Sequence, residues 1–286
     1  MKKLCYAPWY LALVIGSSML STSGLAALAD TGKDINSVSG LLQYIGVITQ
    51  IHSVETLVLE SGTQHSDRCA VNNTAQDQIP SQIPGYSAES MVFDMLQGME
   101  PLNTVDMKPI HRWYNSPLAK KIHTAEMQPA NYSAAKQYVS VLKTEQQRHE
   151  LVKRIVHNTR TTQYVAIIAT EVEYAGILHS GCIDEAQQSI PEGSNKTNPE
   201  KTLADITRND KKLTALLLES DITLELAYKL RDFTLSELAQ YEYFTASDEA
   251  TQFYATLTDA LHRSFRLASV VYQTKAAYES SSFDSQ

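Results

Sequence analysis

Few residue patterns in this chain match the spacing of metal ligands in catalytic sites. His149-Glu150 begins like the zinc-protease pattern H-E-x-x-H, but the fifth position is Lys153, so the second zinc ligand is missing. His157 lies eight residues after His149, about two helical turns away, which is too far for the two histidines to share one metal ion. The sequence therefore predicts neither a metal site nor a cofactor.

Patterns for covalent and acid–base catalysis are equally incomplete. Ser-x-x-Lys, part of the signature of serine penicillin-binding enzymes, occurs at Ser133 to Lys136 and at Ser140 to Lys143 without its S-D-N and K-T-G partners. Glu171 and Glu173 are two residues apart on a predicted helix, so their side chains point about 200° from each other. We therefore predict no catalytic residues.

The first 29 residues have the three parts of a cleaved signal peptide. Lys2 and Lys3 precede the apolar run Leu11–Gly16, and small and polar residues lead to Ala27-Leu28-Ala29. We expect cleavage before Asp30 and export to a bacterial periplasm. The alternative is an uncleaved anchor, but five Ser and Thr residues in this stretch make it a poor membrane span.

The length and charge of the remaining 257 of the 286 residues limit the number of domains and the kinds of partner. A chain of this size buries a full core as one large domain or two small ones. Loss of two lysines with the signal peptide leaves 22 basic against 32 acidic residues, a net charge of −10. Such an acidic chain has no electrostatic case for binding nucleic acid or an anionic membrane surface. No other stretch approaches the length of a membrane span.

Two cysteines survive removal of the signal peptide, Cys69 and Cys182. In an oxidising compartment such a pair predicts a disulfide. The alternative is two free thiols.

Apolar residues recur at spacings of three and four along most of the chain, which predicts an all-α fold. Polar segments rich in Pro and Gly predict loops at residues 62–86 and 184–200. The expected helices cover residues 37–60, 87–97, 106–115, 117–128, 133–143, 150–178, 209–231, 235–244 and 248–280.

Three residues have the sequence context of helix N-caps. Ser116 precedes Pro117, which is well tolerated at the first helical position because its missing N–H has no partner there. Thr234 and Glu237 have the spacing of a capping box. Ser247 precedes two acidic residues that favour a helix N-terminus.

The chain repeats itself in two places. HRWYNSPLAKKI (residues 111–122) resembles YEYFTASDEATQ (residues 241–252), 130 positions later, and the segment from Leu41 resembles that from Leu151, 110 positions later. In each phrase an aromatic pair closes one helix and Ser caps the next, which predicts a helical hairpin corner. We predict a bundle of two related multi-helix units, residues 30–145 and 146–286, or one continuous domain containing both.

The segment Trp113-Tyr114-Asn115-Ser116-Pro117-Leu118-Ala119-Lys120 resembles a motif of a family of exported bacterial proteins that is defined only as a domain of unknown function. That family has Phe-Tyr-x-Ser-Pro-x-Gly followed by Lys, so this chain has Trp for Phe and Ala119 for Gly. The second copy departs further, with Asp248 in place of Pro. The resemblance implies an all-helical, exported protein and carries no catalytic residue across.

Together these features favour a non-enzymatic binding or interaction protein of the cell envelope, whose partner is a protein or a small apolar ligand. Two alternatives are a carrier of an apolar ligand and an envelope enzyme whose site is assembled from scattered residues. A carrier needs a large apolar cavity, and an enzyme needs a cleft with convergent polar groups of perturbed pKa. An interaction protein shows an exposed apolar patch.

Overall fold

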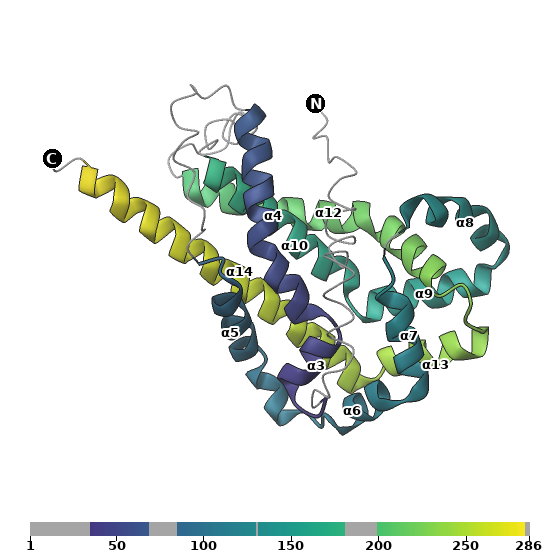
Figure 1. Cartoon of the computed structure of the whole chain (residues 1–286). Helices are drawn as coiled ribbons and strands as arrows, with labels where there is room; N and C mark the ends of the chain where they lie inside the picture. Colours follow the sequence, from purple (N-terminus) through teal and green to yellow (C-terminus); the bar gives the residue numbers. More distant parts are fainter. Residues whose placement is uncertain (1–34, 69–84, 130, 181–198, 284–286) are drawn as a thin grey trace.

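The structure, a computed structural model, describes residues 35–68, 85–129, 131–180 and 199–283 (Figure 1). Within these ranges all regular structure is helical, which confirms the predicted all-α class. The signal peptide, Cys69 and Cys182 lie outside the described residues. The elements are α3 (Val38–Tyr44), α4 (Val47–Arg68), α5 (Ala88–Gly98), the 3-10 helix η3 (Glu100–Thr104), α6 (Lys108–Asn115), α7 (Pro117–Glu126), α8 (Tyr132–Thr144), α9 (Gln146–Asn158), α10 (Thr161–Ser180), α12 (Pro199–Lys229), α13 (Leu235–Thr245) and α14 (Asp248–Phe283).

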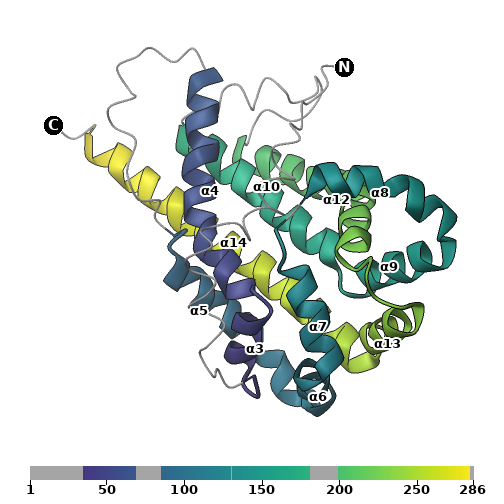
Figure 2. The same ribbon diagram turned by 45° about the vertical axis from the view of Figure 1, so that its right-hand side comes forward.

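Helices from the two halves of the chain pack against each other. The most extensive contacts join α4 to α10 and α5 to α14, and α12 covers another side of α10. Figures 1 and 2 both show α4 and α10 side by side at the centre, with α14 crossing behind them. The core is therefore built jointly by residues that precede and follow position 145.

Two helices that the sequence predicts as continuous are each broken at one residue. Gly46, with φ +82°, separates α3 from α4, and Arg160, with φ +53°, separates α9 from α10. The N–H of Gly46 donates to the Gln43 carbonyl at 3.2 Å, and that of Arg160 donates to the His157 carbonyl at 3.1 Å. The predictions of unbroken helices were wrong here because the apolar spacing continues across a left-handed residue that only redirects the axis.

The helices α4 and α10 run parallel, and residues 114 positions apart lie at the same level. Near their beginnings the Tyr164 hydroxyl donates to Gln50 Oε1 at 2.8 Å. Twelve residues further on, a Cβ added to Gly176 would lie 3.0 Å from the Gly62 nitrogen. Between these points both helices bury residues at spacings of three and four, as in a coiled coil. Residues 114 positions apart are buried on both helices: Ile51 and Val165, Val54 and Ile168, Val58 and Val172, and Ser61 and Ala175.

Gly62 was predicted to end its helix, yet α4 continues through it to Arg68. The prediction failed because a glycine is tolerated within a helix as well as at its end, and here the Gly62 nitrogen lies where α4 comes close to Gly176 of α10. Similarly, α12 begins ten residues before the predicted position 209.

The matched helix breaks bear on the proposed duplication. They give an offset of 114 for this helix pair, in place of the 110 that the sequence alone suggests. With 114, Cys69 corresponds to position 183, one residue beyond Cys182. The duplication and the disulfide both stay predictions.

The two aromatic phrases pack on each other. The Trp113 ring stacks on Phe244 with 4.5 Å between centroids and on Tyr241 with 5.7 Å. Tyr114 meets Phe244 edge-on at 6.0 Å. The aromatic pairs of the two phrases are Trp113-Tyr114 and Tyr243-Phe244, so Trp113 stacks on the second residue of the other pair. The repeated phrase thus supplies both sides of one aromatic contact.

The three predicted N-caps each begin a helix. Ser116 Oγ accepts from the Ala119 N–H at 3.1 Å at the start of α7, and Ser247 Oγ accepts from Ala250 at 3.3 Å at the start of α14. Thr234 and Glu237 form a reciprocal capping box at α13.

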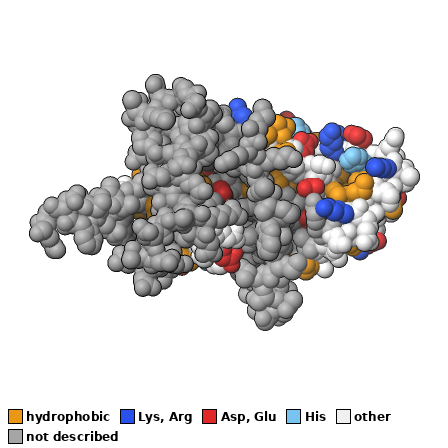
Figure 3. All heavy atoms as spheres, turned by 90° about the horizontal axis from the view of Figure 1, so that it is seen from above, with side chains coloured by type: hydrophobic (Ala, Val, Ile, Leu, Met, Phe, Trp, Pro, Cys, Tyr) orange, Lys and Arg blue, Asp and Glu red, His pale blue; other side chains and the backbone are white. Residues whose placement is uncertain are grey.

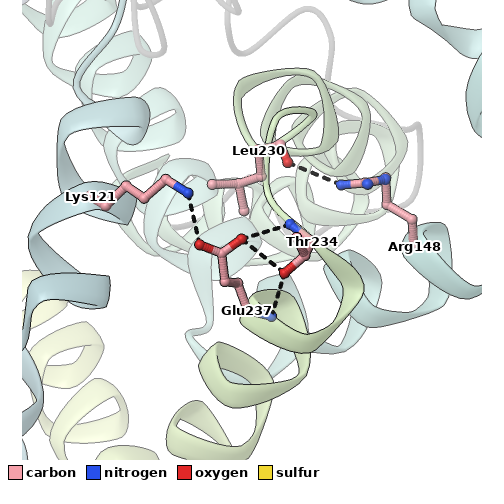
Figure 4. Close-up of polar contacts among 5 residues, drawn as sticks. All are labelled: Lys121, Arg148, Leu230, Thr234 and Glu237. Atoms are coloured by element: carbon pink, nitrogen blue, oxygen red, sulfur yellow. Dashed lines mark hydrogen bonds and ion pairs between the residues drawn. The ribbon is translucent and has the colours of Figure 1, made fainter.

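The corner that Thr234 caps, between α12 and α13, is also held from two other helices (Figure 4). Lys121 of α7 donates to Glu237 Oε1 at 2.7 Å, and Arg148 of α9 donates to the Leu230 carbonyl at 3.1 Å. These contacts fix the direction in which α12 approaches the core.

Gly176→Ala should destabilise the protein by about 1–3 kcal/mol, because the new methyl group would overlap the Ser61 side chain and press on the Gly62 backbone. Chemical denaturation measures this. Adding Ser61→Gly should recover part of the loss. A gain in stability, as for Gly→Ala on an open helix surface, would contradict the close α4–α10 contact.

Ser116→Ala should lower the free energy of unfolding by about 0.5–2 kcal/mol, because the Ala119 N–H loses its acceptor. Ser133→Ala is the control, since Ser133 is exposed on α8, whose cap is Asn131. Equal denaturation curves for the two variants would show that the Ser116 cap contributes nothing.

Candidate binding site along α12

Three leucines form an exposed apolar face in the middle of α12. Leu213, Leu216 and Leu217 are 48%, 70% and 55% exposed. Their spacing of three and four residues puts them on one side of the helix. We call these three residues the leucine face.

A cleft of about 430 Å³ adjoins the leucine face, between α12 on one side and α9 and α10 on the other. Its size falls at the lower end of the range of small-molecule sites. Both apolar and polar side chains line the cleft. The apolar residues are Val156, Ala166, Ile167, Ala215 and Leu216, and the polar ones are His157, Thr162, Gln163, Lys212 and Glu219.

The break at Arg160 shapes this cleft. Because the chain turns there, Val156 and His157 at the end of α9 and Thr162 and Gln163 at the start of α10 all reach it. A non-glycine residue with positive φ costs about 1–2 kcal/mol, and such strain is concentrated at functional sites. The strained residue thus stands beside the cleft.

Charges of both signs flank the leucine face. Lys212 and Glu219 line the cleft from α12, seven residues apart on the same side of the helix. Neither forms an ion pair within the described part of the chain. Viewed from above, the surface that is not covered by grey atoms mixes basic, acidic and apolar side chains (Figure 3). No single-sign field is evident there.

A second polar cluster lies inside the bundle. The Tyr241 hydroxyl donates to Glu126 Oε1 at 2.9 Å, and Lys229 Nζ donates to the Glu126 carbonyl at 2.9 Å. Lys229 also pairs with the buried Glu225 at 3.0 Å. These contacts join the ends of α7 and α12 to α13.

Burial perturbs the titration of this cluster. It raises the pKa of Glu126 from about 4.5 to about 7, against the opposing effects of the Tyr241 hydrogen bond and the Lys229 charge. Burial also raises the pKa of Tyr241, with the Glu126 charge adding to the effect. Nearby, the hydroxyls of Tyr114 and Tyr254 hydrogen-bond each other at 2.8 Å. Perturbed groups mark candidate catalytic sites, but none of these lines the cleft.

The predicted site residues are not part of the cleft. Ser116, Thr234 and Ser247 act at helix ends, and Cys69 and Cys182 lie outside the described residues. His157, considered and rejected as a metal ligand, does line the cleft. Sequence reasoning missed Lys212 and Glu219. Their seven-residue spacing around a leucine cluster was the available signal.

None of the helices in the described ranges is long and apolar enough to cross a membrane. Comparison with protein-family models, with curated proteins and with solved structures gives no match to this chain.

Glu126→Gln should flatten the pH dependence of stability. Between about pH 4.5 and pH 7 the folded protein keeps a proton on Glu126 that the unfolded chain has released, so rising pH favours unfolding. Urea unfolding at pH 5 and pH 8 should show a smaller loss for the variant, because glutamine does not titrate.

Glu173 is the control for this experiment, because burial raises its pKa to about 7 as well. Glu173→Gln should remove a separate share of the same pH dependence. An unchanged difference between the two pH values in Glu126→Gln would contradict the raised pKa of Glu126.

Proposed function

We propose that this protein is an exported, non-enzymatic binding or interaction protein of the bacterial cell envelope, and that the leucine face and its adjoining cleft are the binding site. The observation that carries the proposal is the exposure of Leu213, Leu216 and Leu217 on one helix side. Exposed apolar clusters beside a polar rim are typical of interaction sites. Export itself rests on the N-terminal sequence and on the resemblance of the Trp113–Lys120 motif.

The two alternatives find less support in the described residues. An enzyme would need perturbed groups in its cleft. Glu126, whose pKa burial raises to about 7, contacts Tyr241 and Lys229 and does not line the cleft. A carrier would enclose its ligand, whereas Leu216, a wall residue of this cleft, is 70% exposed. A partner that covers the leucine face is the better match to this geometry.

Site-specific photocrosslinking in living cells tests the proposal. A photoreactive phenylalanine derivative at position 216 should give a defined covalent adduct, because that side chain stands in the centre of the leucine face. The same group at position 235 is the control, since Leu235 is an exposed leucine on a different helix. Both variants must be exported and folded to equal extents.

An adduct at position 216 and none at position 235 is the expected result. Equal yields at both positions would mean random collisions, and no adduct at 216 would remove the leucine face as the binding site. Mass spectrometry of the adduct separates a protein partner from a small ligand.

A further inference from the structure

The pattern of charges along the leucine face is self-complementary. Lys212 and Glu219 lie on the same side of α12, one on each side of the midpoint between Ala215 and Leu216. A two-fold axis that lies beside the helix, perpendicular to it and at the level of that midpoint, carries position 212 of one copy to the level of position 219 of the other. Lys212 of one copy therefore lies at the same level as the oppositely charged Glu219 of the other.

We propose that the occupant of the leucine face is a second copy of this chain, with the two α12 helices packed antiparallel about this axis. The inference rests on the proposed function, because it names the partner of the same surface. In an antiparallel pair, each Lys212 faces Glu219 of the other copy, so two ion pairs form at once. In a parallel pair, residues of the same number share a level, and the opposite charges stay two turns apart.

The apolar residues fit the same arrangement. Leu213, Leu216 and Leu217 occupy the positions that a two-helix seam uses, beside a flanking pair spaced by seven residues. Burying three leucines that are roughly half or more exposed supplies the favourable contact area. The flanking charges then set the direction of the partner helix.

The cleft extends the proposed interface. Lys212, Leu216 and Glu219 belong to both the cleft and the α12 surface, so a second α12 on the leucine face also covers the cleft mouth. The antiparallel dimer thereby covers apolar wall residues of α10, such as Ile167, in addition to the leucines.

Analytical ultracentrifugation over an about hundredfold range of protein concentration tests the dimer, because its population depends on protomer concentration. The unmodified protein should change from monomer to dimer with rising concentration. Leu216→Asp should remove the dimer, and Leu235→Asp, on α13, should leave it unchanged. Circular dichroism of each variant confirms that the helices are retained.

A charge exchange tests the antiparallel geometry. Lys212→Glu alone should weaken dimerisation about tenfold or more, because each new carboxylate faces Glu219 of the other copy. Glu219→Lys alone should do the same with two lysines. The double variant Lys212→Glu/Glu219→Lys restores both pairs and should return the dissociation constant to within about threefold of the original.

A monomer at every concentration overturns the proposal, as does a dimer that survives Leu216→Asp. A double variant no better than the single ones overturns the antiparallel arrangement. The photocrosslinking result separates these failures from failure of the proposed function. An adduct at position 216 with a different protein or with a small molecule, in a chain that stays monomeric, leaves the binding site standing and removes the second copy as its occupant.

Discussion

The close parallel contact between α4 and α10 is the constraint on which the other elements depend. Because Gly176 has no side chain, α10 can lie close to Ser61 and Gly62 of α4 near the far ends of the helices, and the Gln50–Tyr164 hydrogen bond fixes the register near their beginnings. Two helices held at both levels form a rigid core, against which α5, α12 and α14 pack. The site on α12 has a defined shape because one wall of its cleft is this same α10.

Residues 114 positions apart, the offset that the two helix breaks give, meet at two levels of the α4–α10 pair. These are Gln50 with Tyr164 and Gly62 with Gly176. Contacts between corresponding residues are what an approximate two-fold axis along the α4–α10 pair produces. The duplication itself stays a prediction.

The sequence predicted the helical class, most helix ends and the corners, because these depend on local physics. Ser116, Thr234 and Ser247 cap their helices through neighbours three residues away. It did not predict the breaks at Gly46 and Arg160, because the apolar spacing continues across each left-handed residue, and it did not predict that α4 continues through Gly62. The cleft was missed because His157 and Lys212 are separated by more than 50 residues and meet only through packing.

The helix α12 changes its environment along its length. Its last turns carry buried groups, with Ala227 and Leu230 fully enclosed and Lys229 paired with Glu225. Its middle turns expose Leu213, Leu216 and Leu217. An apolar side chain that stays in water gains nothing on folding, so these leucines add little to the stability of the isolated chain. The proposed contact with a second copy would bury them, and it would use the opposite charges of Lys212 and Glu219 that lie beside them.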